Sequence, residues 1–134
     1  MIKRTFGCVA LCLLFLAVGS LQAHHSLAGV YDMKNAKELS GTAADVRFTN
    51  PHGSLGVNVE NPDGTTTKWV LTLGSATALA RRGIGRTGKN AIHPGDKIKV
   101  KFLPAKDGSP LGFLQTVTMP DGRVIQISAG GPNE

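Results

Sequence analysis

The feature that most restricts the fold is a strict alternation of apolar and charged residues between Lys97 and Phe102. Ile98, Val100 and Phe102 fall on one side of this segment, and three lysines fall on the other. A period of two residues is typical of a β-strand with one buried and one wet face. The apolar face must be covered by other elements, so the alternation predicts a sheet built around this strand.

Five further segments have strand patterns and are separated by turn signals. We expect these strands at residues 38–50, 55–60, 65–73, 111–119 and 124–127. The first strand contains Gly41, where we expect a bend or a bulge. Residues 61–64, 106–109 and 120–123 combine Asp and Gly with Asn, Pro or Ser, which indicates turns.

One stretch has a helical pattern instead. Residues 75–83 offer a Ser N-cap, several alanines, two arginines in the last turn and a terminal Gly, which predicts a helix of two to three turns. The glycine-rich, basic residues 84–91 are expected to form a loop. This order predicts an all-β fold with one short helix, a small five- to six-stranded OB-like Greek-key barrel. A small β-sandwich is the alternative, because pattern alone does not fix topology.

The amino-terminal segment has the features of a secretory leader. A basic pair precedes the apolar run Cys8–Val18, which is shorter than a helix that spans a bilayer. We expect a signal peptide at residues 1–23 with cleavage after Ala23, and cleavage after Ser20 is the alternative. The mature chain would be periplasmic or secreted, with no permanent membrane anchor.

The mature chain would comprise a single barrel domain at residues 24–128 and a disordered tail at 129–134. Both cysteines, Cys8 and Cys12, lie in the leader, so the domain would have no disulfide and no thiolate ligand. The formal net charge of the whole chain is +6, but its basic residues are spread along the sequence and not interleaved with aromatic residues. This distribution argues against a nucleic-acid partner.

The sequence has no phosphate-binding loop, no metalloprotease motif and no nucleophile elbow. We therefore expect a binding protein and no enzyme, with no catalytic residue assigned. Trp69, the single tryptophan, lies in an expected strand and is predicted to be a core residue rather than a stacking platform. Tyr31, Phe48 and Phe113 are too dispersed to form the aromatic row of a single-strand binder.

Two adjacent histidines carry the most specific chemistry. Cleavage after Ala23 would make His24 the first residue, and its α-amine and imidazole could chelate one metal ion, with His25 as a second imidazole. Such nitrogen donors favour Cu(II), with Zn(II) and Ni(II) behind it. Cleavage one residue earlier would place His25 third, where a square-planar site can form, whereas cleavage after Ser20 would permit neither chelate. The alternative is that both histidines are simply solvated.

His52 is the third candidate metal ligand. Pro51 precedes it and holds Asn50 extended, so the turn presents His52 rigidly at the end of the first strand. Two other roles for His52 are a turn residue bonded to nearby backbone and, least favoured, the base of a small hydrolase or isomerase. His93, before Pro94, is expected to be a solvated loop residue.

Several blocks of the chain resemble a family of small exported bacterial proteins that is known only as a domain of unknown function. The blocks include HHSLAGVYD at 24–32, FTNPH at 48–52, HPGDKI at 93–98 and MPDGR at 119–123. The resemblance implies a periplasmic or secreted single-domain β protein with no assigned activity. Phe48, Gly53–Ser54 and Ile84 stand where the family usually has aromatic residues, so any ligand surface made by those aromatics would be weakened here.

Together these features predict an exported barrel that binds a transition metal such as copper through His24 and His25, with His52 as a further ligand. The alternative is a protein- or glycan-binding OB-like module that uses the barrel surface and no metal.

Overall fold

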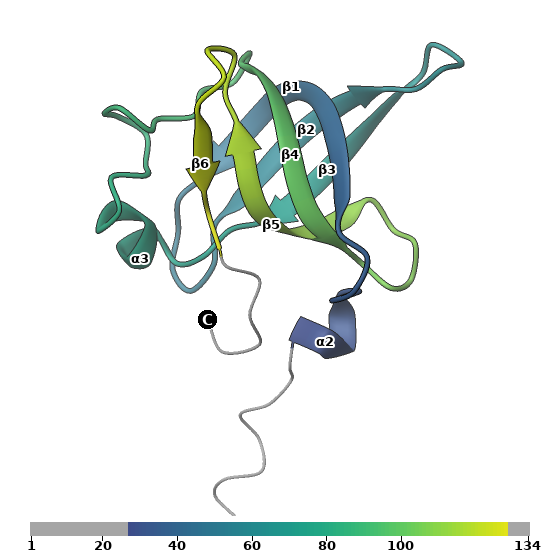
Figure 1. Ribbon diagram of the computed structural model, residues 1–134, viewed down its shortest axis with the longest axis horizontal. Coiled ribbons are helices and arrows are strands. Elements are labelled where there is room, and N and C mark those ends of the chain that lie inside the picture. The colour runs from purple at the N-terminus through teal and green to yellow at the C-terminus, as the bar shows by residue number, and fades with distance from the viewer. Residues whose placement is uncertain (1–26, 129–134) are drawn as a thin grey trace, which may run out of the picture.

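The computed structural model describes residues 27–128 (Figure 1). The elements are α2 (Leu27–Val30), β1 (Lys37–Arg47), β2 (Ser54–Glu60), β3 (Thr66–Thr72), α3 (Ala76–Ala80), β4 (Lys97–Pro104), β5 (Leu111–Thr118) and β6 (Val124–Gln126). All six strands lie where the sequence predicts them, with small differences at their ends, and α2 is an addition. The predicted signal peptide at 1–23 and the predicted tail at 129–134 lie outside the described residues.

The strands close into a barrel. The sheet order is β3-β2-β1-β4-β5-β6, and a parallel pairing between β3 and β5 completes a ring of five strands. Every other strand pairing is antiparallel, and β6 lies outside the ring as the hairpin partner of β5. This closed topology, with a helix between β3 and β4, confirms the predicted OB-like barrel and excludes the sandwich alternative.

Strand β1 curves around the barrel and is shared by two neighbours (Figure 1). Its first half pairs with β4 and its second half with β2, and Thr42 has a partner in both. The prediction of a bulge at Gly41 is wrong, because the register shift falls between Ala43 and Asp45. A side chain at Gly41 would collide with the Asn58 carbonyl oxygen, so glycine is needed there for close backbone approach.

The interior of the barrel is filled by one apolar cluster. The alternation predicted for β4 is confirmed, since Ile98, Val100 and Phe102 are buried and the intervening lysines are exposed. The Trp69 ring is partly buried and packs at 5.1 Å, between centroids, from the Phe102 ring. Trp69 is therefore part of the core, as its place in an alternating strand predicts.

Helix α3 is shorter than predicted, although both of its end signals are confirmed. The Ser75 hydroxyl accepts a hydrogen bond from a backbone N–H of the first turn at 3.2 Å. Gly83 adopts a φ of 71°, and the next N–H, that of Ile84, donates back to the Leu79 carbonyl at 3.0 Å. Leu79 and Ile84 are both buried, so this cap fixes α3 against the core. Neither helix of residues 27–128 has the length and apolar character needed to cross a membrane.

Candidate functional site

Of the predicted metal ligands, the structure describes one. His24 and His25 lie outside the described residues, whereas His52 is exposed in the connection between β1 and β2. Within residues 27–128, no three His, Cys, Asp or Glu side chains come together as a metal site. The described part of the chain therefore provides His52 alone as a histidine at this end of the barrel.

The loop that carries His52 is fixed to α3. The Asn50 side-chain amide donates to the Thr77 hydroxyl at 3.1 Å, and the Thr77 N–H donates back to Asn50 Oδ1 at 3.3 Å. The Thr49 hydroxyl donates to the His52 carbonyl at 2.9 Å, and the Asn50–Pro51 peptide bond is cis. The His52 ring itself makes no hydrogen bond to another described residue. The turn is present where the sequence predicts it and is held by these hydrogen bonds, and the alternative of a ring bonded to nearby backbone is not observed among residues 27–128.

The residue after His52 is locked as well. The Gly53 N–H donates to the Gly74 carbonyl at 3.2 Å, and the Leu73 N–H donates to the Gly53 carbonyl at 2.9 Å. A side chain at Gly53 would collide with the Arg47 carbonyl oxygen, so only glycine fits this position. Both flanks of His52 are thus anchored, and only its side chain remains exposed.

A cavity of about 430 Å³ lies beside His52. Its apolar walls include Leu79, Phe113 and Ile127, from α3, β5 and the segment after β6. Its polar lining includes His52 and Arg82, and within the described residues 27–128 no Asp or Glu lines it. The cavity is therefore apolar inside, with two nitrogen-bearing side chains at its exposed rim.

The start of the described chain is attached to this same end of the barrel. The Tyr31 ring packs on Phe113, with 5.8 Å between ring centroids, and its hydroxyl is 3.1 Å from the Thr72 hydroxyl. Thr72 is the strand partner of Ser54, which is only two residues after His52. Sequence reasoning missed this role of Tyr31, because contacts between distant segments leave no local pattern.

His93 lies at the other end of β4 from Tyr31. Tyr31 bridges Ala105, just after β4, while His93 precedes the first residue of that strand. The His93 ring is exposed, and its backbone N–H donates to Asp96 Oδ2 at 2.8 Å. These observations confirm the prediction that His93 is an exposed loop residue. Because it lies at the opposite end of β4, His93 cannot join His52 in one site.

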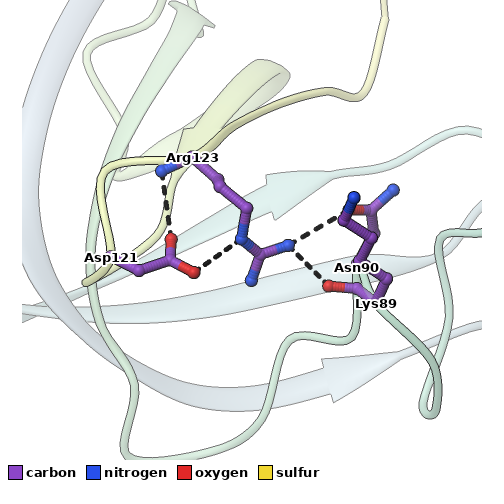
Figure 2. Close-up of polar contacts among 4 residues, drawn as sticks. All are labelled: Lys89, Asn90, Asp121 and Arg123. Atoms are coloured by element: carbon purple, nitrogen blue, oxygen red, sulfur yellow. Dashed lines mark hydrogen bonds and ion pairs between the residues drawn. The ribbon is translucent and has the colours of Figure 1, made fainter.

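A cluster of polar side chains joins the β5–β6 turn to the glycine-rich loop at residues 84–91 (Figure 2). Arg123 Nε donates to Asp121 Oδ2 at 2.6 Å, and Arg123 Nη1 donates to the Lys89 carbonyl at 2.6 Å. The hydrogen bonds from Arg123 lower the pKa of Asp121 below its ordinary value. Both carboxylate oxygens of Asp121 accept hydrogen bonds from Arg123. We therefore interpret the cluster as a structural contact that holds the loop at residues 84–91 against the β5–β6 turn.

An open hollow of about 700 Å³ lies elsewhere on the barrel and has a polar lining. It includes Thr42, Asn58, Glu60 and Thr66, and the Lys97 ammonium, which also lines it, donates to the Thr42 hydroxyl at 2.8 Å. No aromatic side chain is among its lining residues in the described part of the chain. A protein- or glycan-binding module could use this surface, but it lacks the aromatic anchors common in binding sites.

Comparisons with known proteins identify a family but no activity. The sequence model of a family of unknown function (DUF6152) matches residues 12–115, which include β1 to β4 and most of β5. No match was found among curated proteins or among solved structures.

Proposed function

Since the chain belongs to the family of unknown function DUF6152, we propose a function from its own residues: an exported protein that binds Cu(II) through His24, His25 and His52. Removal of a leader after Ala23 would free the α-amine of His24 beside its own imidazole. Together with His25 and His52, these groups would form a set of nitrogen donors, which favours Cu(II) among divalent first-row metals.

The observation that carries this proposal is the attachment of Tyr31 to the His52 end of the barrel. An extended chain covers about 3.3–3.6 Å per residue, so the Cα atom of His25 lies within about 7 Å of the Leu27 Cα atom and that of His24 within about 11 Å. Leu27 begins the helix that leads into Tyr31, whose N–H donates to the Leu27 carbonyl at 2.8 Å. A mature terminus at His24 would therefore be only three residues from α2, and the residue that follows α2, Tyr31, is attached to the end of the barrel that presents His52.

His52 has the properties that a third ligand needs. Its ring is exposed and has no hydrogen-bond partner among residues 27–128, so its nitrogens are accessible to a metal ion. Its backbone is fixed on both sides by contacts with α3 and with residues 73–74 after β3, so little further ordering is required when the metal binds. A fixed ligand on the barrel and two ligands on the terminus would close a loop around the ion.

Isothermal titration with Cu(II) tests the proposal. The protein that begins at His24 is compared with a chain that begins at Leu21, in which neither the terminal chelate nor a square-planar site with a histidine in third place can form. Loss of a group that merely supports a ligand lowers metal affinity about 10–100-fold, so loss of the terminal chelate should lower it at least as much.

His52→Ala should also weaken Cu(II) binding, whereas His93→Ala is the matched control at the other end of β4 and should bind as the unchanged protein does. Equal affinity of the chains that begin at His24 and at Leu21, or no binding by either, would contradict the proposal.

A further inference from the structure

We propose that the cavity beside His52 binds a small monocarboxylic acid with an apolar body, such as a medium-chain fatty acid, and that Arg82 holds its carboxylate. This ligand is additional to the metal ion, and the inference does not rest on the proposed metal site.

The size and lining of the cavity indicate an apolar ligand body. Its volume of about 430 Å³ falls within the range of about 300–1,000 Å³ that is usual for small-molecule sites. Leu79, Phe113 and Ile127 line it from the buried core, and the exposed residues Pro51 and Ala78 add accessible apolar surface. Burial of an alkyl chain against these residues would drive binding.

The charge of the lining selects an anion. Arg82 and His52 line the cavity, and among residues 27–128 no Asp or Glu lines it that would repel a carboxylate. The Arg82 guanidinium is charged at any physiological pH. A neutral alcohol of the same length would fit the walls equally well but would leave this charge without a partner.

The Arg82 side chain is held in place before any ligand arrives. Its Nη2 donates to the Gln126 carbonyl at 3.1 Å and also to the Ile127 carbonyl. These bonds tie the turn after α3 to the end of β6 and the residue that follows it, and they leave Nε and Nη1 without a hydrogen-bond partner among residues 27–128. A guanidinium fixed in this way loses little freedom when it binds a carboxylate.

Two hydroxyl groups complete the polar lining. Ser75 accepts a hydrogen bond from the Ala78 N–H, and Ser128 donates to the Leu114 carbonyl at 2.8 Å. Ser75 therefore retains a donor and Ser128 retains an acceptor. The carboxylate has one arginine and one hydroxyl donor available, while Leu79, Phe113 and Ile127 keep the inner wall apolar.

Titration calorimetry of the processed protein with octanoate, hexanoate and octanol in buffer that contains EDTA tests the inference. We expect octanoate to bind more tightly than hexanoate, by about fourfold for each methylene that is buried. Octanol should bind at least about tenfold more weakly than octanoate, because its uncharged hydroxyl cannot form an ion pair with the Arg82 guanidinium.

Two variants and two controls locate the site. Arg82→Gln should lower octanoate affinity about tenfold or more, while Arg81→Gln, at the neighbouring exposed arginine that does not line the cavity, should leave it unchanged. Ala78→Leu adds volume at an exposed lining position and should also abolish binding without disturbing the core. The chain that begins at Leu21 should bind octanoate in EDTA as the processed protein does, which separates this site from the proposed copper site.

The inference is overturned if octanol binds as tightly as octanoate, if Arg81→Gln weakens binding as much as Arg82→Gln, or if Ala78→Leu binds octanoate normally. Thermal unfolding of each variant is measured alongside. If Arg82→Gln is destabilised, Ala78→Leu takes its place in the comparison, because that variant keeps the Arg82 contacts with Gln126 and Ile127.

Discussion

The hairpin turns and the loop that carries His52 are all short connections, yet different kinds of contact hold them. In each of three turns an aspartate accepts a hydrogen bond from a backbone N–H two residues later. These pairs are Asp63–Thr65, Asp107–Ser109 and Asp121–Arg123. The His52 loop is held by Thr77, 27 positions from its partner Asn50. A turn of the first kind is specified locally, whereas the His52 loop requires α3 to be docked.

The largest expected effect on stability comes from a substitution that weakens the packing of α3 against the barrel, on which the His52 loop depends. Leu79 is 1% exposed and joins α3 to the core. Leu79→Ala should lower the free energy of unfolding by about 2–5 kcal/mol, because it leaves a cavity where the helix meets the barrel. Urea unfolding measures the loss, and Leu111→Ala, at a residue that is 43% exposed, is the control that should change stability far less. Similar losses in both variants would show that α3 is not held by this contact.

A turn glycine gives the next largest effect. Gly122 has a φ of 86°, and a residue with a Cβ atom pays about 1–2 kcal/mol in this left-handed region. Gly122→Ala should therefore destabilise the protein by about that amount in urea unfolding. Gly85 has open space around its Cα and a φ that other residues accept, so Gly85→Ala should be close to neutral. If Gly122→Ala left the free energy of unfolding unchanged, the claim that the turn is specified by its own residues would be contradicted.

The contact between the His52 loop and α3 should have a smaller effect. Asn50→Ala removes the hydrogen bonds to Thr77, and a bond of this kind contributes about 0.5–1.5 kcal/mol to stability. Thr77→Ala removes the hydroxyl partner of Asn50 but keeps the Thr77 N–H, so the two variants share the loss of one bond, and the loss in the double variant should be smaller than the sum of the single losses. A double-mutant cycle in urea measures the coupling, and strictly additive losses would contradict it.

The smallest expected effect is a change in stability at acid pH. Hydrogen bonds from Thr65 and Ser109 lower the pKa of Asp63 and of Asp107 below the ordinary value of 3.8. A carboxyl with a lowered pKa in the folded state stabilises the protein above its unfolded pKa, and this contribution is lost as the pH falls through the folded value. The stability advantage of the unchanged protein over a variant with Asp63→Asn and Asp107→Asn should thus be constant at neutral pH and shrink below about pH 3.8. Urea midpoints across this range measure it, and an advantage that grows in acid would have the wrong sign.

The same division explains which parts of the structure could be predicted from sequence. The alternation in β4, the three turns and both caps of α3 follow from residues that are neighbours in the chain, and all of them are confirmed. The OB-like topology also followed from the order of these elements. The sequence predicts a bulge at Gly41, whereas the register shift lies near Ala44. Glycine occurs both at bulges and where two backbones approach closely, so its presence alone does not identify a bulge.

The site was less predictable than the fold. The exposed, rigid His52 could be read from its Asn-Pro-His turn, since proline restricts the residues beside it. The cavity could not, because it requires Arg82, Phe113 and Ile127 to meet from three separate elements. The contact between Tyr31 and Phe113 likewise depends on the closure of the barrel.

The central claim is that one Cu(II) ion is shared by the mature amino terminus and by His52. Pulsed EPR of the processed, Cu(II)-loaded protein tests it most directly, because the modulation from the remote nitrogen of each coordinated imidazole reports how many histidines bind the ion. We predict one ion per chain and a clear loss of imidazole modulation in His52→Ala, with no change in His93→Ala. A spectrum that His52→Ala leaves unchanged would contradict the claim and assign any bound copper to the terminus alone.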